Sequence, residues 1–273
     1  GFTAIVVNAV NGATALGATT TNTIADLTAA DAKSLTVEGA GTLTFTAAAL
    51  LANLTSVNVT STGTTTFGTT SLATGATFTG AGGAESIILG ATTKAISMGA
   101  GNDTVTAPSA LGAGGSIDAG EGAGDILSMA AANAVLASAT GTFETTISNF
   151  EILSVGAMAA GTAIDLENLD NLNAIVSAGG AFTMTVTNAQ SGFSLTQTAG
   201  ATAHSVTLAT QSLADTMSVK VTGSATIAAG TFTANGIETI SLEADDTATT
   251  PAGAVAHTIT IVDDALKTLN VSG

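Results

Sequence analysis

An aspartate lies inside a glycine-rich stretch at residues 99–107, which read GAGNDTVTA. Glycine lets a backbone turn tightly and bring its carbonyl groups together, because it tolerates positive φ. A carboxylate beside such carbonyls provides the oxygen ligands that a hard cation such as Ca²⁺ prefers. Asp103 therefore predicts either half of a calcium site or, if no metal binds, a tight Asn-Asp turn that caps a solvated strand.

The same arrangement recurs at fixed spacing. In the calcium-binding nonapeptide G-G-x-G-x-D-x-U-x, U is an inward-facing apolar residue, and Asp103 fits its acidic position. Glu85 takes that position 18 residues earlier, and Lys94 takes it between the two. Because two nonapeptides make one coil, we expect Glu85 and Asp103 on one edge of successive coils and Lys94 on the opposite edge. The corresponding apolar residues are Ile87, Ile96 and Val105.

A third acidic coil follows at residues 116–127, which read SIDAGEGAGDIL. Asp125 takes the acidic position there, and Asp118 precedes the loop, where it could complete a site from the side. The repeat is imperfect: Met98 replaces a first glycine, Glu85 replaces Asp, and the glycines near Asp125 are out of step by one residue. The predicted metal-site residues are Gly80, Gly82, Glu85, Gly99, Gly101, Asn102, Asp103, Asp118, Gly120 and Asp125.

Short alternating segments rich in Val, Ile and Thr recur along the chain and predict β-strands. Helical periodicity is limited to residues 130–139 and, more weakly, 167–175. Irregular near-repeats of roughly 20 residues favour coils that stack on their neighbours. We therefore expect an all-β, right-handed parallel β-solenoid (a β-helix or β-roll) with calcium-binding nonapeptide-like loops, and a β-sandwich is the competing fold. The main predicted strands are 33–39, 42–46, 55–60, 86–90, 151–156, 182–187, 204–210, 217–223, 238–244 and 257–262.

The expected organisation has four segments. Residues 1–77 form N-terminal solenoid coils, and residues 78–129 form calcium-binding β-roll coils. Residues 130–148 form a loop or short helix, and residues 149–273 form C-terminal solenoid coils.

Charge and composition exclude several classes of function. The chain has 20 acidic residues, four lysines and no arginine, and its formal net charge is −16. Phosphate backbones are bound mainly by Arg and Lys, so nucleic-acid binding is excluded, and divalent cations are the natural counter-charge. Cysteine is absent, which excludes disulfides and thiolate zinc sites. No apolar run approaches the roughly 18–20 residues needed to span a bilayer.

An enzyme is a competing class, because β-solenoids include proteins that cleave polysaccharides. Such chemistry can use two carboxylates about 5–9.5 Å apart, but those enzymes usually also carry Arg or Lys and aromatic residues to bind sugars. Arg, Trp and Tyr are absent here. We expect His204 and His257 to be ordinary residues at the starts of strands, and we expect no enzymatic activity.

Residues 78–107, FTGAGGAESIILGATTKAISMGAGNDTVTA, with residues 111–127 after them, resemble RTX-type calcium-dependent surface-layer (S-layer) proteins such as that of Caulobacter. Residues 23–60 and the segments NFEILSVG, GIETISLEA and LKTLNVSG are also similar, so the resemblance spans nearly the whole chain and is weakest at 157–235. The family implies an extracellular β-solenoid, exported by type I secretion, that assembles with calcium into a hexameric sheet over the outer membrane. In that family a separate N-terminal domain holds lipopolysaccharide, and neither that domain nor the C-terminal export region has a counterpart here.

The sequence thus predicts a secreted structural protein that self-associates into a calcium-dependent S-layer lattice on the bacterial cell surface. The alternatives are an RTX-type extracellular adhesin or spacer and, with less support, an ice-binding β-solenoid suggested by the Thr-x-Thr run at 183–187. The sequence leaves open whether four further acids bind metal, although solvated loop acids are the favoured interpretation. These residues are Asp245, Asp246, Asp263 and Asp264.

Overall fold

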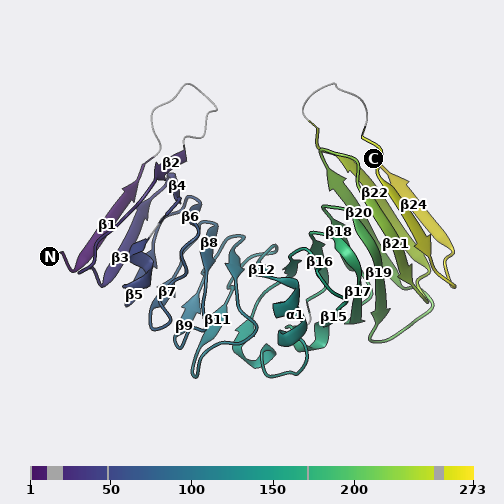
Figure 1. Cartoon of the computed structure of the whole chain (residues 1–273), viewed down its shortest axis with the longest axis horizontal. Coiled ribbons are helices and arrows are strands. Elements are labelled where there is room, and N and C mark those ends of the chain that lie inside the picture. The colour runs from purple at the N-terminus through teal and green to yellow at the C-terminus, as the bar shows by residue number, and fades with distance from the viewer. Residues whose placement is uncertain (1, 11–20, 48, 171, 249–254) are drawn as a thin grey trace. The chain divides into compact units, whose positions relative to one another are not determined.

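Parallel β-strands make up most of the chain in the computed structural model, which describes residues 2–10, 21–47, 49–170, 172–248 and 255–273. The strands stack into a β-solenoid of about 10 turns (Figure 1), and about 6% of the chain is helical. The prediction of an all-β parallel solenoid is therefore confirmed. The competing β-sandwich is wrong, because every described strand pair is parallel.

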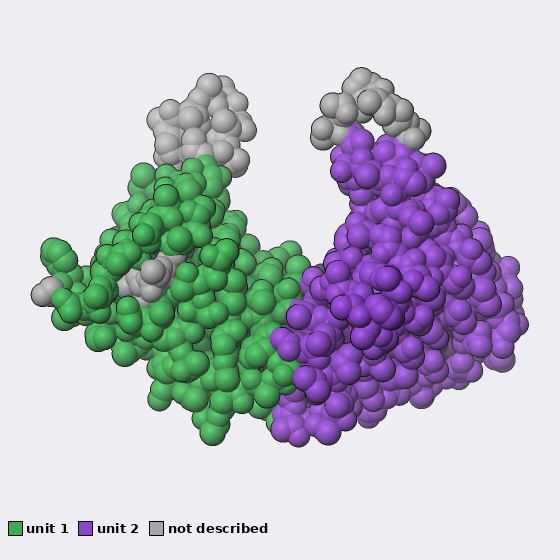
Figure 2. All heavy atoms as spheres, viewed as in Figure 1, with its two compact units in different colours: residues 1–128, 145–151 green, residues 129–144, 152–273 purple. Residues whose placement is uncertain are grey.

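The chain divides into two compact units (Figure 2). Unit 1 comprises residues 1–128 and 145–151, and unit 2 comprises residues 129–144 and 152–273.

Two sheets line unit 1, and successive strands alternate between them. The odd-numbered strands are β1 (Ala4–Ala9), β3 (Ser34–Gly39), β5 (Ser56–Val59), β7 (Thr77–Thr79), β9 (Ala95–Ser97), β11 (Ser116–Asp118) and β13 (Ile147–Ser148). The even-numbered strands are β2 (Thr21–Ile24), β4 (Thr42–Phe45), β6 (Thr65–Phe67), β8 (Glu85–Ile88), β10 (Thr104–Thr106) and β12 (Ile126–Met129). A 3₁₀ helix at Ala49–Ala52 precedes β5, and another at Glu144–Thr146 adjoins β13.

Unit 2 follows the same alternation with longer strands. One series comprises β14 (Ile152–Val155), β16 (Ala174–Ser177), β18 (Phe193–Gln197), β20 (Thr216–Gly223), β22 (Thr239–Asp246) and β24 (Thr268–Ser272). The other comprises β15 (Thr162–Asp165), β17 (Gly180–Ala189), β19 (Ala201–Leu208), β21 (Ala228–Ala234) and β23 (Thr258–Val262). Helix α1 (Ala131–Ala137) lies within the predicted helical segment 130–139.

The weaker helical prediction at 167–175 is wrong for most of its length. Only Leu166–Asn168 forms a short 3₁₀ helix, and the segment ends inside strand β16. The misleading signal comes from Leu166, Leu169 and Leu172, which recur at a helix-like spacing of three residues. All three are buried, so they supply core contacts from the connection between β15 and β16.

The core of each coil is made by inward-facing residues at alternate strand positions. Ile87 and Val105 are register partners, and Ile96 lies in the other sheet of unit 1. All three are buried, as the nonapeptide repeat predicts. Phe67 stacks on Phe45 with ring centroids 5.2 Å apart and meets Phe78 edge-on at 6.0 Å. This row of three rings joins neighbouring coils, and buried aliphatic side chains supply most of the rest of the core of unit 1. Within the described ranges, none of the helices has the length and apolar character to cross a membrane.

Replacing Phe67 with Ala tests this row. Phe67 is 2% exposed, and truncating a buried Phe costs about 3–5 kcal/mol in the free energy of unfolding. We expect a loss of that size in urea denaturation followed by circular dichroism. Phe2→Ala is the matched control, because Phe2 is 83% exposed; equal stability of the two variants would contradict the proposed core row.

Candidate metal centre

Four acidic residues of unit 1 form a column along one edge of the solenoid. Glu85 begins β8, Asp103 precedes β10, Asp125 precedes β12, and Glu151 lies after β13. Ser86 pairs with Thr104, and Thr104 pairs with Ile126, so the first three acids are register neighbours in adjacent coils. Lys94 precedes β9 in the other sheet, which is the placement that the nonapeptide spacing predicts.

Backbone hydrogen bonds connect these acids in one direction. The amide N–H of Glu85 donates to Oδ1 of Asp103 at 2.6 Å. The N–H of Asp103 donates to Oδ1 of Asp125 at 2.7 Å, and that of Asp125 donates to Oε2 of Glu151 at 2.8 Å. The carboxylates of Asp103, Asp125 and Glu151 thus each accept from the backbone of the acid one coil earlier. We call this arrangement the unit 1 carboxylate ladder.

The ladder leaves buried oxygen atoms without partners. Glu85, Asp103 and Asp125 are each at most 1% exposed. Both carboxylate oxygens of Glu85 and the Oδ2 atoms of Asp103 and Asp125 have no hydrogen-bond partner, and none of the described ion pairs reaches these groups. Burying an ionised carboxylate in this state is costly, so the ladder calls for a proton or a cation.

Burial raises the pKa values of the three ladder acids Glu85, Asp103 and Asp125. The loss of hydration raises the pKa of Glu85 to about 8, and the nearby charge of Asp103 adds to this effect. Burial also raises the pKa of Asp103 to about 7, although the hydrogen bond from the Glu85 N–H opposes it. The pKa of Asp125 is raised by burial as well, against the opposing hydrogen bond from the Asp103 N–H.

Glycine backbone lies directly against the ladder. A Cβ atom placed at Gly122 would be 2.6 Å from Oδ2 of Asp125 and would collide with the carbonyl oxygen of Gly101 in the preceding coil. The loop can pass the carboxylate only because residue 122 has no side chain. A carboxylate oxygen and a backbone carbonyl oxygen are therefore close neighbours at this rung.

These donors fit a hard cation. Ca²⁺ takes six to eight oxygen ligands, including carboxylates, backbone carbonyls and water. No three His, Cys, Asp or Glu side chains converge on one point within the described part of the chain. A cation bound at Asp103 or Asp125 would therefore take most of its ligands from carbonyls and solvent. An all-oxygen set of this kind suits Ca²⁺ and not the softer transition metals.

The structure separates Asp118 from the ladder. Asp118 lies on the outer face of β11, where its Oδ1 accepts hydrogen bonds from the Gly120 N–H at 3.1 Å and the Asn149 side chain at 2.7 Å. Asn102 is exposed, and the surroundings of Gly82 are open. These three predicted residues therefore do not join the buried carboxylates.

The remaining predicted glycines lie in stacked loops beside the ladder. The Gly99 carbonyl accepts from the Glu121 N–H at 2.7 Å, and the Gly101 N–H donates to the Glu121 carbonyl at 2.8 Å. Gly120 adopts a φ of 94° that favours glycine, and Gly80 packs against the Glu85 carboxylate.

Sequence reasoning missed Glu151 and the buried acids Asp215 and Glu238 of unit 2. The signal that could have found them is simple: a charged residue immediately before a strand of the even-numbered series. Glu151 precedes ILSV, Asp215 precedes TMSV, and Glu238 precedes TISL. Glycine-centred motifs do not include this position, because the loops before these strands lack the nonapeptide glycines.

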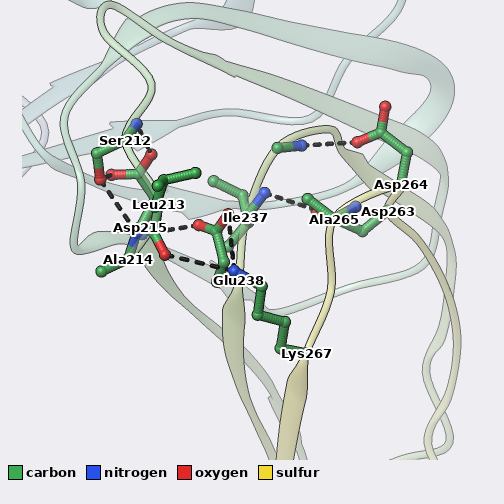
Figure 3. A network of polar contacts seen from close by, with 11 residues as sticks. Ser212, Leu213, Ala214, Asp215, Ile237, Glu238, Asp263, Asp264, Ala265 and Lys267 are labelled. Carbon is green, nitrogen blue, oxygen red and sulfur yellow. Dashed lines mark hydrogen bonds and ion pairs between the residues drawn. The ribbon is translucent and has the colours of Figure 1, made fainter.

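Unit 2 contains a second carboxylate ladder, in which donors from the protein itself pair with the carboxylates (Figure 3). The Asp215 N–H donates to Oε2 of Glu238 at 2.9 Å, which repeats the hydrogen-bond pattern of unit 1. The next residue in register is Lys267, whose ammonium lies 3.7 Å from Oε1 of Glu238. Ser212 donates its N–H and its hydroxyl to Asp215 at 2.6 and 2.8 Å, and these bonds lower the pKa of Asp215.

Four further acids of unit 2, Asp245, Asp246, Asp263 and Asp264, also have partners within the chain. Asp263 accepts from the Ile237 and Ala265 N–H groups, and Asp264 accepts from the Gly236 N–H. Asp245 pairs with Lys220 at 2.9 Å, and Asp246 accepts from the Ala248 N–H at 2.8 Å. Donors from the protein thus already serve the four acids that the sequence left open as metal ligands.

The two histidines occupy different environments. His204 was expected at a strand start, but it lies inside β19 and is 2% exposed. Burial lowers its pKa to about 4, and its Nε2 lies 3.4 Å from the Ser177 hydroxyl. The prediction failed because the strand begins at Ala201, so His204 falls on an inward position. His257 precedes β23 and accepts the Ile227 N–H at Nδ1, 3.2 Å away.

Neither a scan of protein-family models nor a search of curated proteins finds a match to this chain. These comparisons assign the chain to no family. The resemblance to RTX-type S-layer proteins stays a prediction from the sequence.

The unit 1 ladder predicts an unusual pH dependence in metal-free buffer. The pKa values of Glu85 and Asp103 in the folded state lie above their ordinary values of 4.5 and 3.8, so protonation favours folding. This stabilisation is complete below about pH 4 and is lost as the pH rises through 7 to 8, at about 1.4 kcal/mol per pKa unit. We expect the free energy of unfolding of unit 1, from urea titrations, to fall between pH 5 and 9.

Asp103→Asn should flatten this profile. Unit 2 provides an internal control with the opposite sign. The lowered pKa of Asp215 makes its contribution present above about pH 4 and lost at lower pH, and the lowered pKa of His204 makes stability rise between about pH 4 and 6.5. A wild-type unit 1 with constant stability from pH 5 to 9 would contradict the assignment of buried, unpaired carboxylates.

Proposed function

We propose that the chain is a secreted structural solenoid that calcium stiffens and that self-associates into the S-layer of a bacterial cell surface. One observation carries the calcium assignment. Buried carboxylate oxygens of Glu85, Asp103 and Asp125 have no partner and no cationic side chain paired with them, and those of Glu85 and Asp125 lie beside glycine backbone. A divalent cation would neutralise these groups and use the nearby carbonyl oxygens as ligands.

The location of the ladder explains what calcium would do. Each rung joins two successive coils, so a cation shared between a carboxylate and a carbonyl of the neighbouring coil would hold them together. Extracellular calcium sites typically bind at about 10⁻⁴–10⁻³ M. Sites of that strength would stay largely unfilled in a calcium-poor cytoplasm and fill outside the cell. This suits a protein that is exported before its coils become fully ordered.

Assembly follows from the same chemistry and from the resemblance to S-layer proteins. Copies that each carry a formal net charge of −16 repel one another. Calcium reduces this repulsion by binding the acids, so both folding and self-association would respond to the same ion. We assign no catalytic role, since a scaffold of stacked coils needs only its shape and its surface.

Calcium should raise the stability of unit 1. At a free concentration ten times Kd, each independent site adds about 1.4 kcal/mol, and we expect the melting temperature to rise when millimolar CaCl₂ replaces a chelator. Asp125→Asn should bind one ion fewer in isothermal titration calorimetry. Asp118→Asn is the matched control and should bind as the wild type does, because Asp118 faces outward. An identical wild-type melt with calcium and with chelator would refute the calcium assignment.

Self-association is tested separately. We expect sedimentation velocity of the purified chain to show large assemblies in millimolar calcium and dissociation after chelation, and electron microscopy to show ordered sheets. A chain that binds calcium but stays monomeric would favour an RTX-type adhesin or spacer over a lattice former.

A further inference from the structure

Each rung of the unit 1 ladder is an acid and its register neighbour in the preceding coil. The first rung, Thr65 and Glu85, differs from the others. Thr65 and Glu85 are register partners in β6 and β8, and both side chains point inward. The Thr65 N–H donates to the Ala84 carbonyl at 2.9 Å and not to a carboxylate. Glu85 therefore accepts no backbone hydrogen bond, whereas Asp103 and Asp125 each accept one.

Three buried oxygen atoms consequently lack partners on two neighbouring side chains. They are Oγ1 of Thr65 and both carboxylate oxygens of Glu85. Thr65 is 0% exposed and Glu85 is 1% exposed, so bulk water does not reach them. Two hydrogen-bonding side chains that face the same interior without bonding each other point to a shared ligand.

The surrounding backbone adds further oxygen atoms. A Cβ at Gly80 would lie 2.7 Å from Oε2 of Glu85 and would collide with the Met98 carbonyl oxygen. A Cβ at Gly83 would lie 3.0 Å from Oε1 of Glu85 and would collide with the Gly63 carbonyl oxygen. The Glu85 carboxylate is thus enclosed by glycine backbone, with carbonyl oxygens of two other segments close to it.

Charge decides which ligand fits. A water molecule could bond to the three oxygens, but it would leave the carboxylate charge without compensation. A proton on Glu85 would remove the charge, but the Glu85 O–H and the Thr65 hydroxyl would then be only two donors for three oxygen atoms. A hard cation neutralises the carboxylate and accepts all the oxygen atoms as ligands.

We propose that Thr65 and Glu85 form a calcium site, with the Thr65 hydroxyl and the Glu85 carboxylate as side-chain ligands and the Gly63 carbonyl as a backbone ligand. The site rests on the proposed function, because it assumes that unit 1 binds calcium. It adds residues 63–65 of the preceding coil, which lie outside the nonapeptide-like segment and were not among the predicted ligands. Calcium binding would thereby extend one coil towards the N-terminus.

Two near-isosteric variants test this site in the full chain. Glu85→Gln keeps the size of the side chain but removes its charge, and we expect calorimetry with CaCl₂ to find one bound ion fewer. Thr65→Val removes only the hydroxyl, and we expect one site to weaken roughly tenfold, equivalent to about 1.4 kcal/mol. Thr66→Val is the matched control: Thr66 points to the outer face of the same strand, so its binding should equal that of the wild type.

The outcomes separate the two proposals. If Asp125→Asn loses an ion while Glu85→Gln and Thr65→Val bind as the wild type does, this site is refuted and the calcium-binding ladder stands. A wild type that binds no calcium refutes both. Should a variant fail to fold, hydrogen exchange of the wild type decides: calcium must slow exchange in residues 61–66 and 80–87, and unchanged exchange at 61–66 overturns the site.

Discussion

A buried carboxylate needs a compensating charge or a proton, and in a solenoid this requirement is multiplied by stacking. Adjacent strands lie only about 4.8 Å apart, so a residue at one position of a coil lies directly over its counterpart in the next. Acids in phase therefore face one another as well as a low-dielectric interior, and both effects disfavour the ionised form. As a consequence, the pKa values of Glu85 and Asp103 are raised above their ordinary values.

The two units satisfy the first oxygen of a ladder carboxylate in the same way and the second oxygen in different ways. In both, a backbone N–H of one coil satisfies one oxygen of the next acid, as the bonds to Asp103 and Glu238 show. In unit 1 no peptide donor serves the second oxygen of Asp103 or Asp125, whereas in unit 2 the Ser212 N–H donates to Oδ2 of Asp215. Unit 2 supplies Ser212 and Lys267 for this purpose. In unit 1 no such group is paired with Glu85, Asp103 or Asp125 in the described structure. Their unpaired oxygens are therefore available to bind an external ion.

The sequence predicts the coils well because their strands must alternate and pair, and it predicts the ladder only where glycines mark it. Successive acids of the ladder are 18, 22 and 26 residues apart, so extra loop residues, and not a fixed period, separate the later rungs. Strand pairing keeps these acids in register although the loops lengthen. A period-based search therefore finds Asp103 and loses Glu151. Thr65 was missed for another reason: a hydroxyl among many threonines has no signature until its partner strand is known.

The position of the ladder also determines how far its influence reaches. In a solenoid, stability is approximately a sum of nearest-neighbour interfaces between coils. A bound ion would strengthen only the interface that it bridges, but consecutive rungs act on consecutive interfaces, so filling them would make several coils order together. Without ions, the ladder acids of unit 1 would either hold protons or carry uncompensated charge at neutral pH. Those of unit 2 have a lysine, Lys267, and hydroxyl and amide donors as partners. Calcium would then act on unit 1 and not on unit 2, because only the unit 2 ladder has a lysine, Lys267, beside its carboxylates in the described structure.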